Sequence, residues 1–181
     1  MIRDAVPADA AACASIYAPY VTDTVISFEA RPPTPSEVSC RMEQAHLWLV
    51  AEHDSEICGY AYGSPHRERE AYGWAADVSI YLAPKHQRRG LGQRLYTRLF
   101  DGLRDRGVCT LCAGIALPNP ASEALHRRMG FKEVGTYRRI GYKFGRWVDV
   151  RWYQLDLRPN PEAPPDSASL VLPAGLRDEQ H

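Results

Sequence analysis

The chain lacks an apolar run long enough to cross a membrane, and it has no excess of charge of either sign. Its 22 lysines and arginines balance its 22 aspartates and glutamates, so the overall charge does not favour a nucleic-acid partner. The N-terminal Met1–Asp4 stretch has no signal-peptide pattern. We therefore expect a cytoplasmic protein that binds neither a membrane nor a nucleic acid.

Cysteine is scarce and is not spaced for metal binding. The five cysteines are scattered, and their odd number suits free thiols better than a disulfide framework. Cys109 and Cys112 match the C-x-x-C spacing, but they lie in an apolar run that predicts a strand, where residues three apart face opposite sides. No second pair of Cys or His has zinc spacing, so we predict neither a metal site nor a redox role.

The length of 181 residues predicts one domain with a substantial core. We place that domain at residues 1–157. Beyond it, residues 158–181 concentrate proline among serine, alanine and acidic residues, which predicts a flexible or surface-draped tail. Its Leu170–Leu172 segment could dock on the body or on a partner subunit. No internal repeat is present.

Periodicity predicts an alternation of strands and helices along the domain. Alternating or continuous apolar runs predict strands at residues 2–6, 47–51, 57–63, 74–82, 109–116, 131–134 and 148–157, with a short β-prone stretch at 25–28. Helical spacing and capping residues predict helices from residue 7 to about Pro19, from 34–36 to about 45, from 90 to 107 and from 119 to 130. Residues 64–73 form a charged loop before the central strand.

A glycine-containing loop, residues 87–92, links the central strand to the longest helix. A helix N-terminus offers unpaired N–H groups and partial positive charge, and glycine lets a phosphate approach the backbone. We therefore predict that this loop holds a pyrophosphate group. The alternatives are a solvated basic helix face, or a dinucleotide-binding loop, which lacks its acidic ribose partner here.

Two separated motifs together resemble the GNAT superfamily of N-acetyltransferases. The first is Q-x-x-G-x-G, met by Gln87, Gly90 and Gly92. The second runs from Asn119 through His126 to Gly130-Phe131. Ser27–Glu29, Ala71–Tyr81 and Gly141–Val150 are moreover similar to the phosphinothricin and methionine sulfoximine acetyltransferase group. The resemblance covers residues 1–157.

This resemblance implies an α/β fold, in which helices cover both faces of a mixed, mostly antiparallel sheet. It implies transfer of acetyl from acetyl-CoA to the primary amine of a small amino-acid-like acceptor, by direct attack in a ternary complex. It also implies resistance to inhibitory compounds of that kind, a homodimer with the Gly141–Asp149 hairpin near its interface, and no metal. Ile80, Tyr81 and Leu82 would offer backbone groups to the coenzyme arm, and Asn119 and Ser122 would bind the same arm. The implied pyrophosphate cradle consists of Arg88, Arg89, Gly90, Leu91, Gly92 and Gln93.

Two residues carry the implied proton transfers. Asp77 occupies the position of a glutamate that accepts the proton of the amine, and its shorter side chain suggests action through water. His126 occupies the position of a general acid, and an unperturbed imidazole titrates near pH ~6.5. The alternatives are an ion-paired strand carboxylate and a partly buried helix histidine.

The acceptor site is implied by the loop before the central strand. Arg67 and Arg69 would hold an anionic acceptor through their guanidinium groups, although loop arginines are often only solvated. The remaining predicted acceptor residues are Phe28, Tyr72, Trp74, Asp77, Val78 and Ser79. Two other functions stay open: a protein or peptide N-acetyltransferase, which would need an open acidic groove, and a non-catalytic acyl-CoA-binding module.

Overall fold

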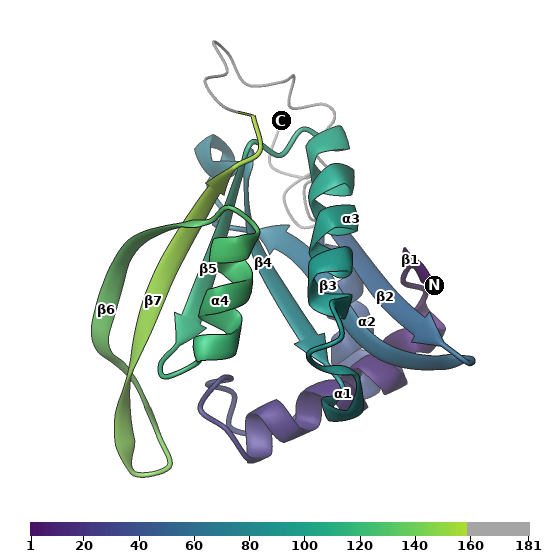
Figure 1. Ribbon diagram of the computed structural model, residues 1–181, viewed down its shortest axis with the longest axis horizontal. Coiled ribbons are helices and arrows are strands. Elements are labelled where there is room, and N and C mark those ends of the chain that lie inside the picture. The colour runs from purple at the N-terminus through teal and green to yellow at the C-terminus, as the bar shows by residue number, and fades with distance from the viewer. Residues whose placement is uncertain (159–181) are drawn as a thin grey trace, which may run out of the picture.

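The computed structural model describes residues 1–158, and its strands form one mixed sheet within that range (Figure 1). In spatial order the strands are β1 (Ile2–Asp4), β2 (Leu47–His53), β3 (Glu56–Pro65), β4 (Ala75–Leu82), β5 (Thr110–Ala116), β7 (Arg146–Asp156) and β6 (Lys132–Lys143). Every neighbouring pair is antiparallel except β4 and β5, which are parallel. The predicted mixed, mostly antiparallel sheet is confirmed.

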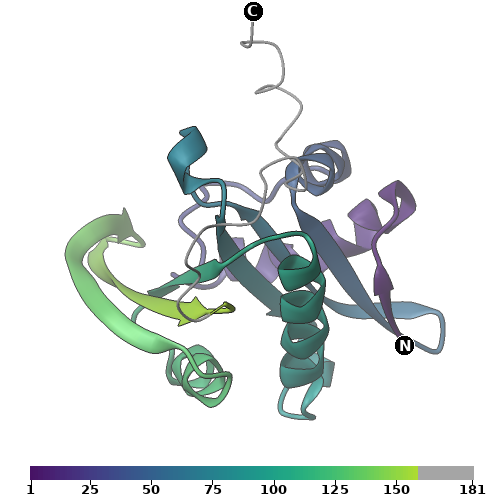
Figure 2. The same cartoon turned by 90° about the horizontal axis from the view of Figure 1, so that it is seen from above.

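Helices cover both faces of this sheet. Figure 2 shows α3 (Leu91–Asp105) and α4 (Pro120–Arg128) on one face and α1 (Ala10–Thr22) and α2 (Pro35–Gln44) on the other. Short 3₁₀ turns at Pro7–Asp9, Glu70–Tyr72 and Pro84–His86 complete the described elements. No helix in residues 1–158 is long and apolar enough to span a membrane.

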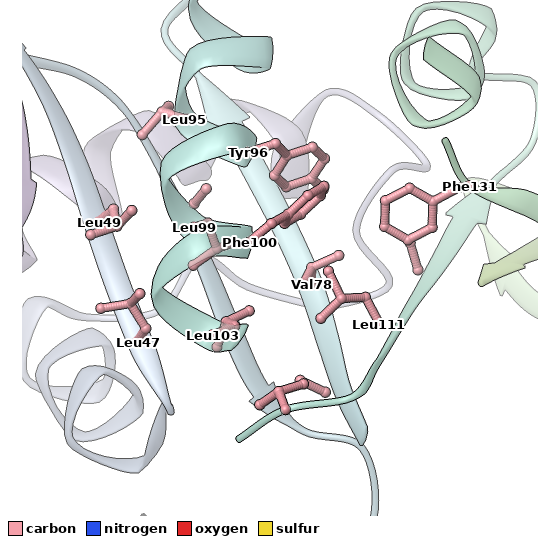
Figure 3. Packing of buried hydrophobic residues seen from close by; sticks show 14 of the residues in the cluster. Leu47, Leu49, Val78, Leu95, Tyr96, Leu99, Phe100, Leu103, Leu111 and Phe131 are labelled. Atoms are coloured by element: carbon pink, nitrogen blue, oxygen red, sulfur yellow. The ribbon is translucent and has the colours of Figure 1, made fainter. Parts of the chain in front are cut away.

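Strand alternation divides the core into two layers. Leu47 and Leu49 of β2 pack with the leucines of α3, and Figure 3 shows Leu95, Leu99 and Leu103 directed toward them. The intervening Trp48 and Val50 face α1 and α2. Truncation of a fully buried leucine to alanine costs about 3 kcal/mol in such cores, so these layers hold the sheet rigid beneath the site.

The helix starts follow from local sequence. Thr34 and Glu37 form a reciprocal capping box at α2, with the hydroxyl accepting from the Glu37 N–H. Asn119 caps α4 by accepting from the Ser122 N–H at 3.2 Å. Gly90 precedes α3 in the left-handed conformation, with φ of 75°.

Two expectations from the N-terminal part of the sequence differ from the structure. Helix α1 continues through Pro19 to Thr22, because a proline in the last turn removes few hydrogen bonds and its carbonyl still accepts from the Asp23 N–H. Residues 25–28 form no strand. Val25 instead packs in a small cluster with Ala116 and Val148.

The β6–β7 hairpin is much longer than predicted. Strand β6 continues to Lys143, and β7 begins at Arg146 rather than at 148. The register shifts between Tyr137 and Gly141, so the apolar alternation that marks a strand is interrupted. Most β6 side chains are exposed, and burial therefore leaves no periodic signal in this strand.

Strands β4 and β5 pair only at one end. Ala75–Asp77 pair with Thr110–Cys112, and beyond Asp77 the two strands diverge (Figure 1). The β4 residues from Val78 to Leu82 therefore have no strand neighbour on that side. This divergence creates the opening in which the candidate site lies.

The predicted tail lies outside the described residues, apart from Arg158. The Arg158 guanidinium donates to the Arg104 carbonyl at 2.9 Å, and its backbone N–H donates to the Cys109 carbonyl at 3.4 Å. The sheet end is thus joined to the end of α3.

Candidate active site

A cavity of about 590 Å³ occupies the opening between β4 and β5. Its walls come from the second half of β4, the start of α3, the end of β5 and one side of α4. The predicted cofactor residues that line it are Ile80, Tyr81, Leu82, Arg88, Gly90, Leu91, Gly92, Gln93, Asn119 and Ser122. Arg89 is exposed and is not part of the lining. The two motifs therefore converge on one space.

The start of α3 provides the anion-binding end of this cavity. Arg88 and Gly90 both have positive φ, 59° and 75°, which turns the loop sharply into the helix. A Cβ on Gly90 would meet no atom within 4 Å, so the loop has open space on that side. The first-turn N–H groups have no partner within a helix, and together with the helix dipole they favour a phosphate.

The open edge of β4 provides a backbone surface. The Ala83 N–H donates to the Cys58 carbonyl of β3 at 3.0 Å. Because hydrogen bonding alternates along an antiparallel ladder, the backbone groups of Val78 and Ile80 point away from β3. They face the cavity side, where an extended ligand could pair with them as a strand would.

Tyr20 closes the end of that edge. Its hydroxyl donates to the Leu82 carbonyl at 2.6 Å and lies 3.3 Å from the Leu82 N–H. The Gln87 amide donates to the same hydroxyl at 3.1 Å. The backbone of Leu82 is therefore already hydrogen-bonded within the protein. Tyr20 has no local sequence signal, because it lies on α1, 62 residues from Leu82.

His126 is buried at the cavity wall, with 3% of its surface exposed. Its Nδ1 lies 2.8 Å from the Ser122 carbonyl, which can only accept, so Nδ1 carries the proton. Its Nε2 then accepts from the Tyr96 hydroxyl at 3.1 Å. Burial lowers the pKa of His126, so the imidazole is neutral near pH ~7. Proton exchange at Nε2 would involve the Tyr96 hydroxyl, which is hydrogen-bonded to that nitrogen and belongs to a residue that also lines the cavity.

Asp77 lies at the last β4–β5 pair, where the strands begin to separate. Its Oδ1 is 2.8 Å from Nδ1 of His66. Burial raises the pKa of the Asp77 carboxyl, and hydrogen bonding to His66 opposes that shift. A raised pKa makes a carboxylate a better proton acceptor.

His66 was missed by sequence reasoning. Asp77 pairs with Ser64 across β3 and β4, which makes His66 its diagonal neighbour two residues further along. Tyr72 and Trp152 pack edge-on against the His66 ring, with centroids at 5.9 and 6.4 Å. A register assignment for the predicted hairpin could have found this partner.

The predicted acceptor residues are less closely grouped. Val78 and Ser79 line the cavity, whereas the other acceptor residues do not. Arg67 and Arg69 are exposed next to His66, on the loop between β3 and β4. The Trp74 carbonyl accepts from the Cys109 and Thr110 N–H groups, so that residue joins two strands. Phe28 lies against Gly141 of β6.

Comparison with protein families agrees with this geometry. A family described as Acetyltransferase (GNAT) family matches residues 12–131. A phosphinothricin N-acetyltransferase from Streptomyces viridochromogenes is 38% identical over 167 residues, which covers 90% of this chain and 91% of the relative. An L-methionine sulfoximine/L-methionine sulfone acetyltransferase from Salmonella typhimurium is 34% identical, with coverage of 92% and 98%.

Solved structures agree as well. A phosphinothricin acetyltransferase of the GNAT superfamily from Sinorhizobium meliloti, in complex with AcCoA, superimposes with a TM-score of 0.87. It is 32% identical, and the match covers 92% of this chain and 93% of that one. The similarity extends over almost the entire described chain.

Proposed function

Because the chain belongs to the GNAT acetyltransferase family, we propose that this acetyl-CoA-dependent N-acetyltransferase acts on a small, anionic, amino-acid-like amine. The observation that carries the proposal is the position of Asp77. Asp77 is the last β4 residue paired with β5, directly before the cavity-lining Val78, and its strand follows a loop that presents two exposed arginines. The named relatives act on phosphinothricin and methionine sulfoximine, both of which are compounds of this class.

Acetyl-CoA is the acetyl donor, and the cavity has the features that a coenzyme A molecule requires. We propose that the first-turn N–H groups of α3, with Arg88, hold its pyrophosphate. The backbone groups of Val78 and Ile80 would pair with the pantetheine arm. The Asn119 carboxamide oxygen already caps α4, so its remaining capacity and the Ser122 hydroxyl would serve the same arm.

The proposed reaction is a direct attack of the amine on the thioester. Asp77, directly or through water, removes the proton of the acceptor ammonium group, and the neutral amine attacks the acetyl carbonyl. A β4 backbone N–H stabilises the oxyanion that develops there. The carbon–sulfur bond then breaks, and the coenzyme thiolate takes the second proton of the attacking nitrogen, directly or by exchange with the Tyr96 hydroxyl that His126 holds in place. Positioning of the two substrates provides much of the rate increase.

Arg67 and Arg69 are proposed to select the acceptor. A guanidinium group pairs bidentately with carboxylate and phosphinate groups, and both arginines lie on the loop that leads into β4. A protein N-terminus or a lysine acceptor would favour acidic residues there. The loop also carries Glu68 and Glu70, so its charges balance, and the preference for a small anionic acceptor rests on the two guanidinium groups themselves.

A thiol-release assay tests this proposal. We expect turnover with phosphinothricin, methionine sulfoximine or related amino acids, and none with peptides. Asp77→Asn should lower kcat/KM by about 10² to 10⁴-fold, and Arg67→Ala should raise the acceptor KM without changing that of acetyl-CoA. Activity confined to peptides, or an unchanged Asp77→Asn enzyme, would overturn the assignment.

We also propose a homodimer formed through the β6–β7 hairpin. Strand β6 is a sheet edge, and the hairpin exposes large apolar side chains with 53–66% of their surface accessible. These residues are Val134, Tyr137, Ile140, Tyr142, Phe144 and Trp147. An exposed apolar sheet edge favours association, and a second copy offers a matching edge. Light scattering should show a dimer that Tyr142→Glu and Trp147→Glu weaken; a wild-type monomer would refute it.

We propose that residues 1–157 form the acetyltransferase domain. We also propose that the protein acts in the cytoplasm, which is supported by the free state of all five cysteines.

A further inference from the structure

Three strands bring together His66, Asp77 and Cys112. Asp77 pairs with Cys112 across β4 and β5, and Asp77 pairs with Ser64 across β3 and β4. As a result, one nitrogen, one carboxylate oxygen and one sulfur lie within 4.8 Å of one another. All three side chains are partly exposed, so solvent can reach the group.

We propose that this cluster is an inhibitory binding site for a thiophilic divalent cation, with zinc as the best match. Histidine nitrogen, carboxylate oxygen and cysteine sulfur are all ordinary zinc ligands, and three protein ligands leave a fourth position open to water. The inhibitory part rests on the proposed function, because the ion would occupy the carboxylate that accepts the amine proton. Acetyl transfer itself needs no metal.

The geometry requires small movements of the ligand atoms. Ligand bonds of about 2.0–2.3 Å place tetrahedral donor atoms roughly 3.3–3.8 Å apart. His66 and Asp77 are 2.8 Å apart, so the ion must replace their hydrogen bond and separate them by roughly 0.5 Å, while the Cys112 sulfur moves inward by at most about 1 Å. Edge-on packing by Tyr72 and Trp152 holds the His66 ring in place.

The charges around the cluster determine how tightly it should bind a cation. Asp77 contributes one negative charge, and Cys112 contributes a second when it binds the ion and releases its thiol proton to solvent. Arg67 is close enough to interact with both side chains and opposes the cation. We therefore expect zinc to bind reversibly and to lower the acetyltransferase activity when free zinc is present. A permanently occupied structural site is not expected.

The C-x-x-C spacing would pair the Cys112 thiol with Cys109, which does not belong to this cluster. Cys109 is buried, and its Sγ contacts the Gly107 carbonyl at 3.5 Å. Cys112 instead belongs with residues that lie 35 and 46 positions earlier in the chain. A site assembled from three strands has no local spacing, so the sequence alone does not reveal it.

Cobalt titration of the full chain tests binding without using activity. Co²⁺ bound to a thiolate absorbs in the near ultraviolet. We expect this band at one equivalent of Co²⁺, its loss on zinc addition, and its absence in Cys112→Ala and Cys112→Ser. Cys40→Ser, which removes an exposed thiol elsewhere, is the matched control and should keep the band. A full band in both Cys112 variants would overturn the site.

Inhibition is measured separately. Cys112→Ala should retain basal turnover and a normal melting temperature, while the zinc concentration that halves activity rises by about 10 to 100-fold. Equal zinc sensitivity of Cys112→Ala and wild type would overturn the proposed inhibition. A Cys112-dependent cobalt band without any zinc inhibition would keep the metal site but overturn its inhibitory role and the part assigned to Asp77 in transfer.

Discussion

His66 donates its Nδ1–H to the carboxylate of Asp77 across β3 and β4, with 2.8 Å between Nδ1 and Oδ1. The imidazole fixes the orientation of the carboxylate, and its hydrogen bond opposes the rise in the Asp77 pKa that burial causes. His66→Phe keeps the ring packing but removes this bond. We expect kcat to fall by about 10-fold while the acetyl-CoA KM stays constant. The acidic limb of the pH–rate profile should move to higher pH, because the lost hydrogen bond no longer lowers the pKa of Asp77. His53→Phe, at an exposed position, is the control; an unchanged kcat and profile in His66→Phe would disprove the pairing's role.

Gly90 tests the phosphate cradle. Its φ of 75° is costly for alanine, so Gly90→Ala should destabilise the fold by about 1–2 kcal/mol and raise the acetyl-CoA KM. Gly135→Ala is the matched control, because a Cβ there also meets no atom within 4 Å and its φ is not positive. Urea denaturation and initial rates measure the two effects. If the two variants had the same unfolding free energy and the same acetyl-CoA KM, the left-handed turn at Gly90 would contribute neither to stability nor to coenzyme binding.

Gly141 tests the contact between the hairpin and Phe28. A Cβ at residue 141 would overlap the Phe28 ring. Gly141→Ala should therefore cost about 1–3 kcal/mol of stability in the wild type, and close to nothing in a Phe28→Ala background. An equal cost of Gly141→Ala in both backgrounds would show that the cost does not come from the Phe28 ring. We also expect a higher acceptor KM for Gly141→Ala.

His126 links folding to pH. Burial lowers its folded pKa, so the unfolded chain binds a proton more readily than the folded one. The contribution to stability is therefore complete above the unfolded value of about 6.5 and is lost as pH falls below it, by up to ~1.4 kcal/mol per pH unit. Denaturation between pH 5 and 8 should show a smaller slope for His126→Gln than for wild type. The exposed control His53→Gln should keep the wild-type slope, and an unchanged slope in His126→Gln would contradict the assignment.

Local signals made the helices and the coenzyme side of the site predictable. The leucines of α3 recur at every fourth residue, and Gly90 and Asn119 mark helix starts by their own chemistry. These features need only neighbouring residues to define them. The cavity then brings together all the predicted cofactor residues except Arg89, which is exposed.

Long-range register made the acceptor side harder to predict. His66 and Cys112 approach Asp77 only because three strands pair in one particular register. The extended β6–β7 hairpin likewise carries exposed aromatic residues and a register shift, so burial leaves no periodic pattern. Tyr20 reaches the Leu82 carbonyl from α1, which is another contact between residues far apart in the sequence. Contacts of this kind depend on the assembled sheet, and sequence periodicity does not encode them locally.

The short pairing between β4 and β5 divides the sheet into two halves, β1–β4 and β5–β7–β6, whose connecting ladder spans three residue pairs in the described chain. An acetyl-CoA arm in the gap would act as a removable strand that fastens one half to the other. The donor would then be a stiffening element of the molecule as well as its reagent. Amide hydrogen exchange at Val78 and Ile80 should slow when acetyl-CoA binds. The connection between the two halves would weaken again each time coenzyme A is released.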